Sequence, residues 1–97
     1  MAKMEMADLL QYVVMVEKDQ RLKAWHIALL SALLYMALKQ GRMQAVKVSR
    51  SKIMALSHIN TFPTYHKYFK DLQQMGYIIY RPSYHPGFRS EVDLKTI

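Results

Sequence analysis

SRSKIMALSHINTFPTYHK, residues 49–67, is the stretch that decides the fold. Ser49 is a typical N-cap residue and predicts a short helix over residues 49–57. The segment His58-Ile59-Asn60 reads as a turn. A second helix over residues 61–75 follows, capped by Asn60 or Thr61. Pro63 in its first turn costs little, because the backbone amides of a first turn have no hydrogen-bond partner within the helix. Two helices joined by a short turn predict a helix-turn-helix unit, which most often reads DNA.

The second of these helices divides into two faces. Aromatic and aliphatic residues recur at helical spacing, so this stripe is expected to turn inward: Phe62, Tyr65, Phe69 and Leu72. The remaining positions are polar and basic, and they suit a helix that enters the major groove. The expected DNA contacts from this helix are Thr61, Thr64, His66, Lys67 and Lys70.

The segment after Gly76 predicts a β-hairpin. Residues 77–81 are aromatic and β-branched, residues 82–87 form a loop with two prolines, and residues 89–94 return as a second strand. A short alternating segment over residues 45–48 adds an edge strand. The hairpin would act as a wing on the duplex, with expected contacts from Arg81, Tyr84, His85 and Arg89.

Two further helices are predicted before this unit, over residues 4–18 and 22–40. Asp19 marks the break between them and could cap the second. The second helix is apolar nearly all round, so it is either the central core helix or packs on another subunit, and the core interpretation is favoured. We therefore expect a single domain over residues 1–97, mainly α with a small β-wing, with residues 1–40 as an N-terminal helical extension. A homodimer through these N-terminal helices is an alternative.

Positive charge is concentrated in the second half of the chain. The net charge is +7; residues 1–40 carry five basic and four acidic residues (+1), and residues 41–97 carry nine basic and three acidic residues (+6). Clustered positive charge suits a polyanion. At the start of the first short helix, free amides and basic side chains predict a phosphate clamp of Ser49, Arg50, Ser51 and Lys52.

Several classes of protein are disfavoured by the inventory of residues. The chain has no cysteine, and its four histidines lack paired metal-ligand spacing, so neither a metal nor another cofactor is expected. No nucleophile motif or glycine-rich phosphate loop argues for an enzyme. The apolar run over residues 27–38 is too short to span a bilayer, and the N-terminus does not resemble a signal peptide, so we expect a cytoplasmic protein without a membrane segment. No ligand pocket is predicted.

The chain resembles the winged helix-turn-helix superfamily, and more narrowly small winged-helix transcriptional regulators of gut bacteria and their mobile elements. The resemblance covers about residues 7–94 and is most specific at Thr64-Tyr65-His66-Lys67 and Pro82-Ser83-Tyr84. Its other segments are Asp19-Gln20-Arg21-Leu22, His26-Ile27-Ala28-Leu29, residues 48–54, Gly76-Tyr77-Ile78 and residues 80–86. The wing tip, residues 86–90, departs from the pattern of the group. The resemblance implies a winged-helix fold and no catalytic residues.

Sequence-specific binding of double-stranded DNA in transcriptional control is the function we predict. One alternative is an accessory factor for the excision or replication of a mobile element. Another is a winged-helix module that binds other proteins. A weaker alternative is a stacking platform for single strands, formed by Tyr65, Tyr68, Tyr77 and Tyr80. Helical spacing favours a core position for Tyr65.

Overall fold

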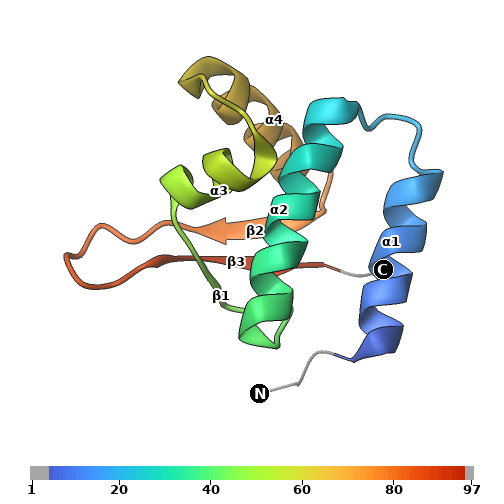
Figure 1. Cartoon of the computed structure of the whole chain (residues 1–97), viewed down its shortest axis with the longest axis horizontal. Coiled ribbons are helices and arrows are strands. Elements are labelled where there is room, and N and C mark those ends of the chain that lie inside the picture. Colours follow the sequence, from blue (N-terminus) through green and yellow to red (C-terminus); the bar gives the residue numbers. More distant parts are fainter. Residues whose placement is uncertain (1–4, 96–97) are drawn as a thin grey trace.

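Four helices and a three-stranded antiparallel sheet make up residues 5–95, the part of the chain that this computed structural model describes (Figure 1). The elements, in chain order, are α1 (Met6–Lys18), α2 (Ala24–Gln40), β1 (Val46–Val48), α3 (Arg50–Ser57), α4 (Phe62–Gln74), β2 (Ile78–Arg81) and β3 (Ser90–Leu94). The predicted mainly α fold with a small sheet is confirmed, and the arrangement is compatible with a winged helix. Element ends differ from the predicted ones by at most two residues; the predicted start of the first helix at Met4 lies outside the described residues.

The sheet has the order β1-β3-β2, so β3 is paired on both edges. The registers place Val46 opposite Val92 and Ile78 opposite Leu94. These four side chains are buried, and they alternate with outward-facing residues as a half-buried antiparallel sheet requires. The outer face of the same strands carries charged side chains.

α2 is the central helix of the molecule, and Figure 1 shows it crossing the sheet with α3 and α4 at one end. Seven of its residues are buried, and Leu29, Leu33 and Ala37 are completely so. The interpretation of this helix as the core helix is confirmed. Its large apolar residues Trp25, Ile27, Tyr35 and Leu38 stay exposed. None of the helices within residues 5–95 is long and apolar enough to cross a membrane.

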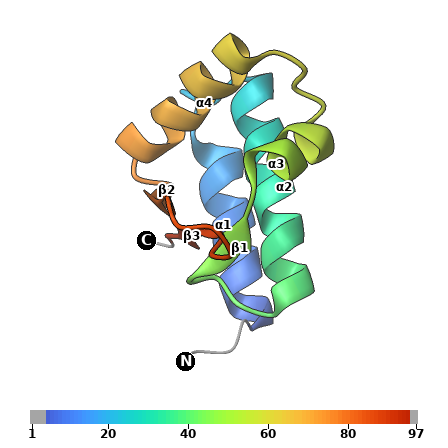
Figure 2. The same ribbon diagram turned by 90° about the vertical axis from the view of Figure 1, so that its left-hand side faces the viewer.

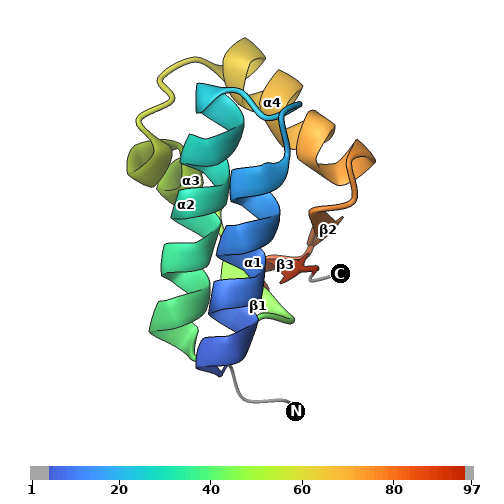
Figure 3. The ribbon, with the colours of Figure 1, turned by 90° about the vertical axis from the view of Figure 1, so that its right-hand side faces the viewer.

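α1 runs antiparallel to α2 along the outside of the molecule (Figure 3). Tyr12 anchors it, because its ring is completely buried and its hydroxyl donates to the carbonyl oxygen of Tyr77 at 3.2 Å. The hydroxyl of Tyr77 in turn donates a hydrogen bond to Asp19 Oδ2 at 2.7 Å. Burial, with the hydrogen bond to Asp19 second, raises the pKa of Tyr77 to about 12. These two tyrosines therefore join α1 to the start of β2.

The break between α1 and α2 is predicted correctly, but Asp19 does not cap α2. Its carboxylate accepts from the backbone N–H and the side chain of Arg21 instead. The N-cap of α2 is Lys23, whose N–H donates to Nδ1 of His26 at 2.8 Å. The imidazole of His26, at the third position of the helix, thus caps the helix start.

Candidate nucleic-acid interface

The start of α3 presents basic side chains to the outside. Ser49 is the N-cap, and its Oγ accepts from the Lys52 N–H at 3.3 Å, so this predicted phosphate ligand is already used as a cap. Arg50, Ser51 and Lys52 are exposed. The guanidinium of Arg50 lies 4.6 Å from the centroid of the Phe62 ring, which fixes its position against the start of α4.

A tight turn sets the angle between α3 and α4. His58 adopts the left-handed conformation with φ of 61°, an uncommon state for a residue other than glycine, and its N–H closes the end of α3 on the Ala55 carbonyl. The next residue, Ile59, is buried and anchors the turn in the core. The second helix therefore leaves the turn in a fixed direction.

α4 has the two faces that its sequence predicts. Tyr65, Phe69 and Leu72 are buried, and the rings of the first two are stacked with centroids 5.2 Å apart. Lys67 and Lys70 point outward, and the side chain of Lys67 is 61% exposed. Burial raises the pKa of Tyr65 to about 12, as expected for a phenol in the core rather than on a stacking platform.

The first turn of α4 departs from the prediction in two details. Phe62 was predicted to be buried but is 54% exposed, because it lies at the helix start, where it contacts Arg50 and His66 and not the core. Thr61 occupies the N-cap position without accepting a backbone N–H; its hydroxyl donates to Thr64 Oγ1 at 2.9 Å. Thr61 and His66 are exposed, whereas Thr64 is half-buried.

Asp71 ties α4 to the beginning of α2. Its Oδ2 lies 2.9 Å from Nε2 of the buried His26 and 3.8 Å from Nζ of Lys67. Because Nδ1 of His26 accepts the Lys23 N–H, Nε2 carries the ring proton and donates it to Asp71. The hydrogen bond from His26 is the main reason that the pKa of Asp71 is lowered. Lys67 therefore shares a carboxylate with a histidine 41 positions earlier in the printed sequence.

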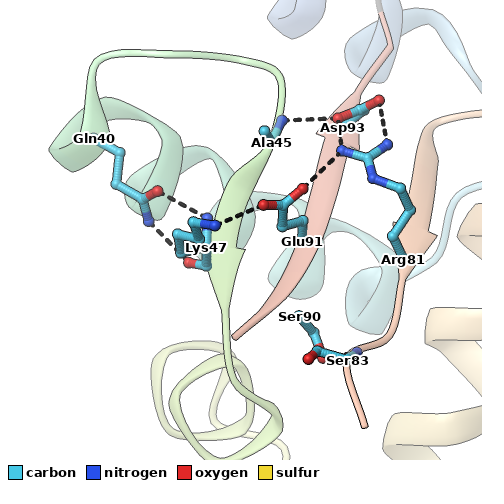
Figure 4. A network of polar contacts seen from close by, with 8 residues as sticks. All are labelled: Gln40, Ala45, Lys47, Arg81, Ser83, Ser90, Glu91 and Asp93. Atoms are coloured by element: carbon cyan, nitrogen blue, oxygen red, sulfur yellow. Dashed lines mark hydrogen bonds and ion pairs between the residues drawn. The ribbon is translucent and has the colours of Figure 1, made fainter. Parts of the chain in front are cut away.

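Charged residues at the base of the β2–β3 hairpin neutralise one another (Figure 4). Arg81 donates to both oxygens of Asp93 at 2.7 Å and to Glu91 at 3.3 Å. Lys47 of β1 donates to the other oxygen of Glu91 at 2.6 Å. These hydrogen bonds raise the pKa of Arg81 and lower the pKa values of Asp93 and Glu91. Arg81, a predicted DNA contact, is thus already paired with two carboxylates.

The register of the strands explains this pairing. Arg81 lies directly opposite Glu91 across β2 and β3, and Asp93 is its diagonal neighbour on the same face. Lys47 is opposite Glu91 on the other side of β3. The amide of Gln40 covers the free edge of β1 by exchanging two 2.8 Å hydrogen bonds with the backbone of Lys47 (Figure 4).

The tip of the hairpin carries the other predicted wing residues. Tyr84, His85 and Arg89 are exposed, and no carboxylate pairs with the two basic side chains among the described residues. Figure 2 looks onto this end of the molecule, with α3 and α4 above the hairpin.

An open groove of about 660 Å³ lies between the start of α3, α4 and the hairpin. It brings together five predicted site residues from these three elements: Ser49, Arg50, His66, Lys70 and Arg89. No aspartate or glutamate lines it. Its walls are formed by residues up to 42 positions apart in the sequence, from Val48 to Ser90. Thr61, Thr64, Lys67 and Tyr84 lie outside this groove.

Sequence reasoning missed two residues of this surface. Lys39, at the end of α2, lines a smaller hollow of about 240 Å³ together with Lys52 and Arg89. Phe88 lines the large groove and is 74% exposed. Lys39 is not among the DNA contacts predicted from the sequence, because its nearness to Lys52 and Arg89 depends on tertiary packing.

Every carboxylate of residues 41–95 has a cationic or imidazole partner. These are Asp71, Glu91 and Asp93. In contrast, Arg50, Lys52, Lys70 and Arg89 have no carboxylate partner among the described residues. Residues 5–95 also contain no group of three or more histidine or carboxylate side chains that could hold a metal ion. The site can therefore attract an anion.

Comparisons with protein-family models, with curated proteins and with solved structures found no match to this chain.

Proposed function

We propose that this chain is a winged helix-turn-helix protein that binds double-stranded DNA with sequence preference and regulates transcription. α4 would be the recognition helix in the major groove, the start of α3 would hold phosphates, and the hairpin would be the wing. One observation carries the proposal. Four unpaired cations from α3, α4 and the hairpin surround or border a groove without carboxylates, while the aromatic side of α4 is in the core.

The cations divide by the part of DNA that each can reach. Arg50, Lys52 and Lys70 suit phosphates, which position the protein without reading sequence. Lys67 and Thr64, near the start of α4, suit base edges. Lys67 would leave Asp71 at little cost, since an exposed ion pair contributes about 0–1 kcal/mol.

Selection from a random duplex pool at physiological salt tests the proposal. We expect an enriched motif, and a slope of log affinity against log salt of about −4 to −5 if about four to six phosphates are neutralised. The Lys67→Ala variant should relax the motif, whereas Arg50→Ala should weaken all sequences alike. Lys18→Ala, an exposed lysine on α1, is the matched control and should bind like the parent. The absence of both enrichment and salt dependence would contradict the proposal.

The outer face of α1 and α2 favours a second interaction, with another copy of the chain. Exposed apolar side chains lie along both helices, and they are Met6, Leu10, Val13, Val14, Trp25, Ile27, Tyr35 and Leu38. Figure 3 looks onto these two antiparallel helices. A two-fold dimer through this face would present two DNA-binding surfaces for half-sites separated by about one helical turn. Light scattering of the protein at micromolar concentration tests this; a monomer there contradicts it.

A further inference from the structure

Two aromatic rings project from the tip of the β2–β3 hairpin. Tyr84 is 87% exposed and Phe88 is 74% exposed, more than any other large apolar side chain in the described residues. Single exposed apolar residues are ordinary on a protein surface. Two rings on one hairpin tip, four positions apart, form a local aromatic surface that the core does not use.

Several contacts hold the hairpin that carries these rings. Its base is clamped by the Arg81–Asp93 ion pair and by Ser90, whose Oγ accepts from the Ser83 N–H at 3.1 Å. A turn closes where the Phe88 N–H donates to the His85 carbonyl at 3.2 Å. Pro82 and Pro86 fix two further φ angles. Little conformational entropy would be lost when such rings meet a partner.

An unpaired arginine accompanies the rings. Phe88 and Arg89 line the groove that faces α4 and also a second hollow of about 520 Å³, which Tyr84 and His85 share. The carboxylate in that hollow, Glu91, is already held by Lys47 and Arg81. The tip therefore combines flat apolar surfaces with positive charge, the chemistry that suits stacked bases next to phosphates.

We propose that the hairpin tip inserts Phe88, with Tyr84 beside it, between base pairs in the minor groove and bends the duplex. This inference rests on the proposed function, because the wing must first reach the minor groove next to α4. The ring takes the place of a lost base–base stacking contact, and Arg89 lies beside the phosphates of the narrow groove. Flexible pyrimidine–purine steps are the preferred sites, since they unstack most easily.

Bending and unstacking can be measured on one duplex that contains the selected motif. The duplex carries a donor and an acceptor dye at its ends and 2-aminopurine at a pyrimidine–purine step under the wing. We expect the parent protein to raise both energy transfer and 2-aminopurine fluorescence. The Tyr84→Ser/Phe88→Ser variant should bind roughly tenfold more weakly, with an unchanged salt slope, and should raise neither signal. Ile79→Ser removes an exposed apolar side chain of β2, away from the tip, and should behave like the parent.

The outcomes separate this inference from the proposed function. If the parent binds the duplex tightly but neither bends nor unstacks it, the insertion is wrong and DNA binding stands. A double variant that bends DNA like the parent also overturns the insertion. If the parent binds the unpaired strand more tightly than the duplex, the rings serve single strands and the insertion is wrong. Failure to bind any duplex at low salt overturns the proposed function itself.

Discussion

The face formed by α3, α4 and the hairpin differs from the outer face of α1 and α2 in how its charges are used. Residues 5–40 carry four basic and four acidic residues, a net charge of zero, and leave apolar side chains exposed. Residues 41–95 carry nine basic and three acidic residues, a net charge of +6, and all three acidic ones are paired. One face thus suits a polyanion, and the other suits an apolar partner.

Two arginines of the same hairpin show that position decides which charges are available. Arg81 lies in the sheet and donates to Glu91 and Asp93, whereas Arg89, near the tip, has no carboxylate partner in the described residues. Net charge alone would count them equally. Pairing within the sheet leaves Arg89 as the better phosphate ligand.

The largest expected effect comes from removing three cations of the α3–α4–hairpin face together. The Arg50→Ala/Lys70→Ala/Arg89→Ala variant should bind duplex DNA roughly 500-fold more weakly at about 0.1 M salt. For each neutralised phosphate, affinity rises about eightfold when salt falls from about 1 M to about 0.1 M, because log affinity changes by about 0.9 per log unit of salt concentration. Fluorescence anisotropy over a salt series measures both the affinity and the slope.

The Lys18→Ala variant is the matched control, because this lysine is exposed on α1, outside the α3–α4–hairpin face. It should keep the parent slope, whereas the triple variant should lose about 2.7 units of slope. Equal slopes for the two variants would mean that charge acts over the whole protein and not through one face.

A smaller effect, on dimer formation, is expected from substitutions on the outer face of α1 and α2. The Leu10→Ser/Leu38→Ser variant should raise the dissociation constant of the proposed dimer by at least about tenfold, because a two-fold interface loses each side chain twice. Both leucines are exposed in the protomer, so its free energy of unfolding should change by no more than about 0.5 kcal/mol. Sedimentation equilibrium measures association, and an unchanged constant would show that the dimer does not use this face.

The junction between the two faces depends on Tyr77. The Tyr77→Phe variant loses the hydrogen bond to Asp19 and should lower the free energy of unfolding by about 1 kcal/mol. Tyr84→Phe removes an exposed hydroxyl without such a partner and should leave stability unchanged. Urea denaturation compares the two. Similar values for both variants would show that the Tyr77–Asp19 bond does not hold α1 in place.

The smallest effect concerns the paired carboxylates of the hairpin base. Hydrogen bonds from Arg81 lower the pKa of Asp93 below its ordinary value of 3.8. Its contribution to stability is therefore fully present above about pH 5 and is lost as the pH falls through 3.8 toward the folded-state pKa. Asp93→Asn should lower stability at pH 7 by no more than about 1 kcal/mol and flatten the loss below pH 4.

Glu17→Gln changes an exposed carboxylate on α1 and serves as the control for this pH series. It should follow the parent at every pH. Denaturation midpoints from pH 2.5 to pH 7 provide the measurement. If the stability of Asp93→Asn falls with pH as steeply as that of the parent, the Arg81–Asp93 pair does not have this role.

Local pattern was enough to predict the elements and the two faces of α4. Tyr65, Phe69 and Leu72 recur at helical spacing next to Lys67 and Lys70, and burial follows that spacing. Phe62 is the exception, because the first turn of the helix extends beyond the core. Periodicity describes a helix face, but it does not show where the neighbouring surface ends.

Tertiary contacts made the rest of the candidate site unpredictable. The bond between His26 and Asp71 joins α2 to α4, and the Arg81–Asp93 pair depends on the register of β2 and β3. Lys39 reaches the surface near Lys52 only because α2 packs against α3 and β1. Each of these contacts joins residues that are distant in the sequence. The spacing of residues within one element therefore could not predict them.

Amide chemical-shift mapping during titration with a short duplex tests the central claim most directly. We predict that the signals that shift first belong to the start of α3, to the first half of α4 and to the hairpin tip, including Arg50, Lys67 and Arg89. The amides of α1 should keep their positions. Shifts confined to α1 and α2, or no shifts at low salt, would contradict the account.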